Sequence, residues 1–190
     1  MHWSDATHFL CLRFDACGDL AVCAPAFKAL KAAGPSRRIT LLTSPACLPL
    51  AQRLDEVDNI ILYDPPWLSL SSEHEAIADR RMITRLDAQD FDAAIIFTKR
   101  GESPLPAALM CTLADIPLRL GRGIEHPGGL LTHWLRDTPA EDGASEAQRQ
   151  LAMVRSIERD DSQPYPHAAN DVTLVRGPVA QQAPHARAAR

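Results

Sequence analysis

The segment Arg13-Phe14-Asp15-Ala16-Cys17-Gly18-Asp19 places two carboxylates and a glycine directly after an apolar run. A carboxylate that faces a bound hydroxyl group can act as a general base and accept its proton. Gly18 lets the backbone turn tightly, so Asp19, the next residue, is a candidate base aimed into a crevice. The alternative is that Asp19 caps a helix, because aspartate is favoured at helix starts with or without a reaction.

The same segment lacks the patterns of the common nucleotide-binding loops. It has one glycine rather than GxGxxG, and it does not end in Gly-Lys-Ser/Thr. Elsewhere the chain has no GxSxG motif, and Glu73-His74-Glu75 is not the HExxH of zinc proteases. Dinucleotide-dependent enzymes, P-loop NTPases and these two classes of hydrolase are therefore disfavoured.

The five cysteines are odd in number and contain no CxxC pair, which argues against a disulfide framework and against a zinc site. We expect them to be reduced and mostly to serve as small buried hydrophobic residues. Cys17 differs, because it precedes an expected helix N-terminus, where a thiolate would be stabilised. The cysteines are Cys11, Cys17, Cys23, Cys47 and Cys111.

Short apolar runs alternate with longer amphipathic stretches over most of the chain, which predicts a βαβ order. The run 92–98 is apolar on both faces, as in a parallel sheet covered by helices. This order predicts right-handed crossovers in an open, Rossmann-like, doubly wound and mainly parallel α/β sheet, with ligands at the carboxyl ends of the strands. The expected strands are 8–14, 38–43, 59–64, 92–98 and 116–120, and the expected helices are 19–33, 45–54, 73–86, 103–114 and 145–158.

The 190 residues suffice for one domain and a tail, which we place at 8–158 and 159–190. Residues 159–190 are expected to be disordered or to lie outside the domain's family. The net charge of −4 gives no electrostatic footprint for nucleic acid. No apolar run approaches the ~18 residues of a membrane span, and the first residues do not form a signal peptide, so the expected compartment is the cytoplasm.

Several motifs, taken in order, resemble the N-terminal lobe of glycosyltransferase family 9, the ADP-heptose:lipopolysaccharide heptosyltransferases and their relatives. The resemblance covers about residues 8–158. It rests on Arg13-x-Asp15-x-x-Gly18-Asp19, on Ala24-Pro25-Ala26-Phe27-Lys28-Ala29-Leu30-Lys31 and Arg38-Ile39-Thr40-Leu41-Leu42, and on 57–64, 91–95, 103–108 and 116–121.

The resemblance implies a GT-B enzyme of two Rossmann-like lobes, with the acceptor on the N-terminal lobe and the nucleotide-sugar on the C-terminal lobe. It implies no metal and no cofactor, a donor such as ADP-heptose as co-substrate, and transfer of a heptose or another sugar to a lipopolysaccharide core. The aspartate of the family's Gly-Asp pair is its proposed base, which is Asp19 here. The C-terminal lobe is absent from this chain, so we expect a truncated product or a fragment that holds half a site and binds neither ADP nor ADP-heptose tightly.

An anionic glycolipid or saccharide acceptor would suit basic side chains at strand ends. Lys99 and Arg100 follow the fourth expected strand and Arg122 follows the fifth, although solvated loops are the alternative for all three. The predicted acceptor-binding residues are Asp15, Gly18, Lys99, Arg100, Arg122 and His126. A lipid acceptor also implies peripheral contact with the cytoplasmic face of the inner membrane, for which no basic amphipathic helix gives independent support.

A second hypothesis is a non-catalytic α/β binding or interaction module derived from such a lobe. Asp19 distinguishes the two, because only a transferase would lose turnover when this carboxylate is removed. A complete, small nucleotide-dependent enzyme is disfavoured by the missing phosphate-binding loop.

Overall fold

Six parallel strands form one sheet in the order β3-β2-β1-β4-β5-β6 in the computed structural model of the chain. The structure describes residues 1–68, 75–137 and 143–158. This arrangement confirms the predicted Rossmann-like α/β fold, with every strand pair parallel. The strands are β1 (His8–Arg13), β2 (Arg38–Thr43), β3 (Asn59–Leu62), β4 (Ala93–Ile96), β5 (Leu118–Gly123) and β6 (His133–Arg136).

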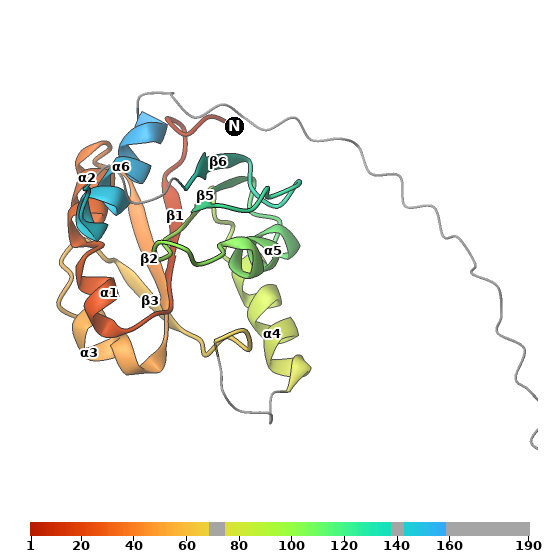
Figure 1. Cartoon of the computed structure of the whole chain (residues 1–190). Coiled ribbons are helices and arrows are strands. Elements are labelled where there is room, and N and C mark those ends of the chain that lie inside the picture. The colour runs from red at the N-terminus through yellow and green to blue at the C-terminus, as the bar shows by residue number, and fades with distance from the viewer. Residues whose placement is uncertain (69–74, 138–142, 159–190) are drawn as a thin grey trace, which may run out of the picture.

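Helices cover both faces of the sheet (Figure 1). On one face lie α1 (Cys17–Ala21), α2 (Ala24–Ala32), α3 (Leu48–Ala51) and α6 (Glu146–Glu158), together with the short 3₁₀ helix η1 (Pro45–Cys47). The other face carries α4 (Ala76–Asp87) and α5 (Leu105–Leu113). Two buried apolar clusters, one on each side of the sheet, fill the space between the layers. The predicted tail, 159–190, lies outside the described residues.

The helix predicted from Asp19 to Ala33 is two helices, α1 and α2, with Val22 and Cys23 between them. Pro25 lies in the first turn of α2, where its missing N–H costs nothing. In one continuous helix the proline ring would clash with the preceding turn, so the chain starts a new helix instead. The predicted helix 45–54 is likewise shorter, and forms η1 and α3.

The sequence prediction missed β6, which pairs in parallel with β5 across the connection 124–132. β5 also runs further than predicted, so Arg122 lies within this strand rather than after it. Gly123 allows the close approach of Pro104, since a Cβ atom added there would lie 2.8 Å from the proline Cδ. Before β1, Trp3 and Ala6 are buried, and the Trp3 indole donates a hydrogen bond to Nδ1 of His133 at 3.0 Å.

Leu109 and Leu113 lie on the exposed face of α5. Leu109 and Leu113 are 47% and 57% exposed, whereas Ala107, Ala108, Met110 and Cys111 are buried. This helix is apolar on all sides, so its periodicity did not distinguish the buried face. No helix in the described ranges is long and apolar enough to cross a lipid bilayer.

Candidate functional site

The strand order reverses between β1 and β4, since the chain proceeds outward from β1 to β3 on one side and from β4 to β6 on the other. Ligands of open α/β sheets bind at the carboxyl ends of the strands at this switch point. The segments that leave β1 and β4 here are 14–19 and 97–104. They hold both predicted carboxylates and the predicted pair Lys99-Arg100, so the fold brings together residues about 80 positions apart.

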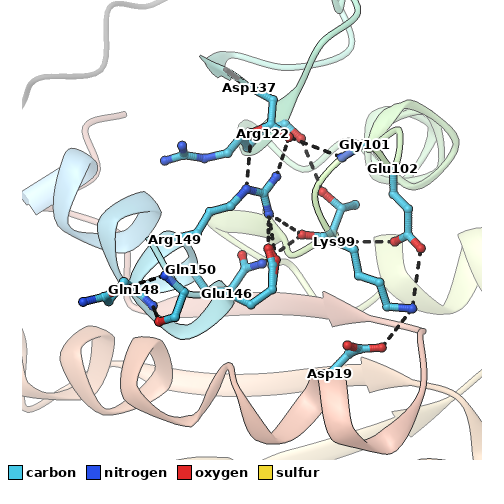
Figure 2. Close-up of polar contacts among 12 residues, drawn as sticks. Asp19, Lys99, Gly101, Glu102, Arg122, Asp137, Glu146, Gln148, Arg149 and Gln150 are labelled. Atoms are coloured by element: carbon cyan, nitrogen blue, oxygen red, sulfur yellow. Dashed lines mark hydrogen bonds and ion pairs between the residues drawn. The ribbon is translucent and has the colours of Figure 1, made fainter. Parts of the chain in front are cut away.

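Asp19 and Lys99 form an ion pair across the switch point (Figure 2). Lys99 Nζ lies 2.9 Å from Oδ2 of Asp19 and 3.8 Å from Oε1 of Glu102. The hydrogen bond to Asp19 is the main cause that raises the pKa of Lys99. Lys99, which we expected to meet an anionic ligand, therefore holds the candidate base in this structure.

Asp19 does not cap a helix, because Ala16 is the N-cap of α1 and Asp19 lies within the first turn. Its side chain is 24% exposed, so a ligand can reach it. Gly18 is also helical, and a Cβ atom added there would meet nothing within 4 Å. The tight turn expected at Gly18 is therefore wrong. The glycine leaves open space beside Asp19 instead.

Arg13 is a buried cation beneath both carboxylates. Its Nε lies 2.9 Å from Oδ2 of Asp15, and its Nη2 lies 3.8 Å from Oδ1 of Asp19. The guanidinium nitrogens have no hydrogen-bond partner of normal geometry among the described residues. Arg13 therefore acts on the two carboxylates mainly through its charge.

A cavity of about 250 Å³ opens beside the Asp19–Lys99 ion pair, and its lining includes Glu102, which Lys99 contacts. Burial raises the pKa of Asp15 to about 6, against the opposing charge of Arg13, and the neighbouring Glu102 carboxylate adds to the rise. The Phe14 and Trp67 rings meet edge to face at 5.8 Å. The described lining contains no basic side chain: it consists of Leu12, Phe14, Asp15, Trp67, Leu68, Ile96, Phe97, Thr98, Glu102, Ser103, Pro106 and Ala107. A cavity with aromatic walls and two carboxylates suits a sugar ring, which offers C–H faces and hydroxyl donors.

Helix α6 holds the segment after β4 in place (Figure 2). Arg149 Nη2 pairs with Oδ2 of buried Asp137 at 2.8 Å, and Arg149 Nη1 donates to the Thr98 carbonyl at 2.7 Å. Gln150 donates to the same carbonyl at 2.8 Å. Although burial opposes the change, the Arg149 hydrogen bonds lower the pKa of Asp137. Thr98 precedes Lys99, so this network fixes the backbone from which Lys99 reaches Asp19.

The other predicted residues occupy the same edge of the sheet but not the cavity lining. Arg100 lies in the turn after β4, and its charge also lowers the pKa of Asp137. Arg122 lies near the end of β5, and its carbonyl accepts a hydrogen bond from Thr98 Oγ1 at 3.3 Å. His126 is exposed in the β5–β6 connection, where its Nδ1 accepts a hydrogen bond from the Gly128 N–H at 3.1 Å.

Sequence reasoning missed Glu102, Trp67 and Arg149. Glu102 stands in the same short segment as Lys99 and Arg100, and its place three residues after Lys99 was the available signal. Trp67 is a large aromatic residue in a proline-rich stretch, another signal of a ligand contact. The role of Arg149 depends on how α6 packs against the segment after β4, and no local sequence pattern indicated this role.

No protein-family model matches the chain, and neither does any curated protein sequence. Several solved structures share its fold, including these three. Escherichia coli ADP-heptose LPS heptosyltransferase II superposes with a TM-score of 0.63 at 24% identity, over 78% of this chain and 40% of that chain. A glycosyl transferase family 9 protein from Veillonella parvula gives 0.59 at 13% identity, over 80% and 41%.

Escherichia coli heptosyltransferase WaaC, solved with ADP-2-deoxy-2-fluoro heptose, gives a TM-score of 0.57 at 14% identity, over 87% of this chain and 51% of that chain. The described chain therefore has the fold found in part of these transferases. It spans about half or less of the length of each of the three.

Proposed function

We propose that this chain is the acceptor-binding half of a glycosyltransferase that moves a heptose or a related sugar from a nucleotide-sugar to a saccharide acceptor. The observation that carries the proposal is the Asp19–Lys99 pair beside the cavity at the switch point, in a fold shared with heptosyltransferases. Lys99 contacts Asp19 and also Glu102, which lines the cavity. The Asp19 carboxylate therefore lies at the edge of the cavity.

In this reaction Asp19 accepts the proton of an acceptor hydroxyl while the hydroxyl oxygen bonds to the anomeric carbon of the donor sugar. The bond from that carbon to the nucleoside diphosphate breaks, and the diphosphate leaves with the electron pair. The Lys99 ammonium group holds the Asp19 carboxylate in place at the edge of the cavity, where this base can accept the proton. Arg13 adds a second positive charge from below.

The donor would bind outside the described residues. WaaC was solved with an ADP-sugar, and this chain matches 51% of that protein's length. We propose that a second lobe supplies the nucleotide-sugar and that the chain uses it as a co-substrate, with no cofactor and no metal. The choice of ADP-heptose and of a lipopolysaccharide core acceptor rests on the motif resemblance and belongs to the same proposal.

The acidic cavity refines the proposed acceptor. Asp15 and Glu102 would repel a carboxylate or phosphate in the cavity, but they accept hydrogen bonds from sugar hydroxyls. We propose that an uncharged ring of the acceptor enters the cavity. Acidic groups of the acceptor would then lie outside it, toward Arg100 and Arg122 on the same edge of the sheet.

An apolar groove of about 170 Å³ between α4 and α5 continues from the cavity, because Trp67 and Pro106 line both. The exposed Leu109 and Leu113 line the groove as well. An acceptor with lipid tails would bring a bilayer to this side of the molecule, and apolar side chains gain by burial in it. We therefore propose peripheral contact with the cytoplasmic face of the inner membrane, made through this groove.

A hybrid enzyme tests the proposal. The full chain is joined to the part of Escherichia coli heptosyltransferase II that it does not cover, and sugar transfer from ADP-heptose to a heptose-bearing core saccharide is measured. We expect transfer that Asp19→Asn lowers by at least about 100-fold, the usual size of a general-base contribution. Asp55→Asn, at an exposed aspartate, is the matched control and should leave the rate unchanged.

The competing hypothesis, a non-catalytic binding module, predicts saccharide binding without turnover and no difference between the two variants. A folded hybrid that binds both substrates but transfers no sugar would support that module and contradict the transferase.

A further inference from the structure

Cys17 and Cys47 lie side by side at the edge of the candidate site. The Cys17 thiol donates a hydrogen bond to the Cys47 sulfur, with the two Sγ atoms 2.9 Å apart. The sulfurs of a disulfide are about 2.0 Å apart, so closing the bond requires a movement of roughly 1 Å. Both cysteines are free thiols in this structure.

The sheet sets this proximity. β1 and β2 are parallel neighbours, and their last residues, Arg13 and Thr43, are register partners. Cys17 follows Arg13 by four residues and Cys47 follows Thr43 by four, so the two segments leave the sheet together and bring their thiols side by side. Contacts on both sides hold the pair: Cys17 Sγ lies 3.3 Å from the Ala46 carbonyl oxygen, and Cys47 Sγ lies 3.5 Å from the Asp15 carbonyl oxygen.

The two thiols differ in access to solvent. Cys17 is half-buried and Cys47 is buried, so a reagent in solution meets Cys17 first and Cys47 is positioned to react second. The other three cysteines, Cys11, Cys23 and Cys111, are buried, and burial raises the pKa of each thiol. Because the thiolate is the reactive form, these three are poor competitors.

We propose that Cys17 and Cys47 form a reversible intramolecular disulfide by exchange with a low-molecular-weight disulfide such as oxidised glutathione. The Cys17 thiolate attacks one sulfur of the reagent, forms a mixed disulfide and releases one glutathione thiolate. The Cys47 thiolate then attacks the Cys17 sulfur and releases the second glutathione. The protein loses two electrons and two protons, and the reagent is reduced to two thiols.

The bond would link the candidate site to the neighbouring loop. Cys17 stands two residues after Asp15 and two before Asp19, so a covalent bond to Cys47 fixes the backbone between the two carboxylates. The hydrogen bond to Cys47 is the main cause that raises the pKa of the Cys17 thiol, so exchange should be faster above neutral pH than at pH 7.

The test uses the reduced, full-length chain in a series of glutathione buffers, followed by thiol counting after denaturation. We expect the five thiols to fall to three, and a reductant to restore all five. Tryptic mapping of the oxidised protein should join peptide 14–28 to peptide 39–53, which needs no variant. Because Cys23 shares the first peptide, Cys23→Ser is the control, and it should still lose two thiols, whereas Cys17→Ser should lose none.

Three results would overturn the proposal. One is the persistence of five thiols in fully oxidised glutathione, and another is a disulfide that joins two chains. The third is loss of the 14–28 to 39–53 link in the Cys23→Ser variant, since Cys23 would then be the true partner.

Discussion

Asp15 and Asp19, the two carboxylates of the segment after β1, have different environments and therefore suit different chemical roles. Asp19 is paired with Lys99 and accessible, as a base that must be ionised requires. The Asp15 side chain is only 8% exposed, and burial raises its pKa to about 6. Asp15 therefore suits hydrogen bonding to a ligand in the cavity better than proton removal at its edge.

The shift at Asp15 predicts how stability depends on pH. Between pH about 4 and 6 the native state keeps a proton that the unfolded state has lost, so the native state loses stability as the pH rises through this window. Asp15→Asn removes this effect. The free energy of unfolding of the wild type relative to the variant should fall by up to about 3 kcal/mol between pH 4 and 7.

Urea denaturation of both proteins at several pH values measures this difference. The Asp55→Asn variant, at an exposed aspartate outside the candidate site, is the matched control. If the difference in the free energy of unfolding between the wild type and Asp15→Asn does not change with pH, the Asp15 carboxyl group has the same pKa in the native and unfolded states.

Local sequence was sufficient to find Asp15 and Asp19, because a carboxylate at the end of the first strand of an α/β sheet has a known place in the fold. It was not sufficient to find the partner of Asp19. Lys99 reaches it only because β1 and β4 are neighbours, which the strand order decides. The sequence placed Lys99 at the correct edge but gave no reason to pair it with Asp19.

At the scale of elements, α6 holds the segment after β4, residues 97–104, in place. Arg149→Met would leave the buried Asp137 carboxylate without its ion-pair partner and remove a donor from the Thr98 carbonyl. Loss of one partner of a buried ion pair costs about 3–5 kcal/mol, so the free energy of unfolding should fall by that amount. Chemical denaturation measures it.

Two further variants test this mechanism. Arg155→Met removes an exposed arginine of the same helix and should change stability by no more than about 0.5 kcal/mol. Adding Asp137→Asn to Arg149→Met should recover part of the loss, because it removes the uncompensated charge. Equal losses in the Arg149 and Arg155 variants would contradict the role given to the ion pair.

The exposed face of α5 gives a prediction for membrane contact. Leu109→Gln with Leu113→Gln keeps helix propensity and leaves the core untouched, so the fold should be as stable as that of the wild type. Binding to vesicles of phosphatidylethanolamine and phosphatidylglycerol should weaken about tenfold or more, since two leucines no longer enter the bilayer.

Sedimentation with vesicles measures the binding. Ile124→Gln is the matched control, because Ile124 is exposed and apolar but lies outside the groove. If all variants bind vesicles equally, the groove has no part in membrane contact.

Elements with strong apolar runs were predicted well, and those shaped by tertiary contacts were not. The first four strands lie within the predicted ranges, because each contains adjacent apolar residues at its centre. β6 has four residues and follows β5 without an intervening helix, so it lacked the βαβ spacing on which the prediction depended. The sequence did not predict which face of α5 is buried, because this helix is apolar on all sides.

At the scale of the whole molecule, the charge at the switch point argues against a nucleotide site at this place in the described part of the chain. Asp15, Asp19 and Glu102 surround the crevice, and the exposed cation among them, Lys99, is already paired. A diphosphate would meet three carboxylates there. In addition, α1 is only five residues long, and the segment before it lacks the glycines that bring backbone N–H groups to phosphate.

We therefore expect ADP to bind the full chain with a dissociation constant weaker than about 1 mM, equivalent to less than about 4 kcal/mol of binding free energy. Isothermal titration calorimetry measures it, with the hybrid enzyme described above as the positive control because its added lobe is the one proposed to bind the nucleotide-sugar. Lys99→Met should weaken any residual binding further, since it removes the exposed cation beside the carboxylates. Micromolar ADP affinity in the chain by itself would show that the crevice takes a nucleotide despite its charge, and the assignment of this lobe to the acceptor would then be wrong.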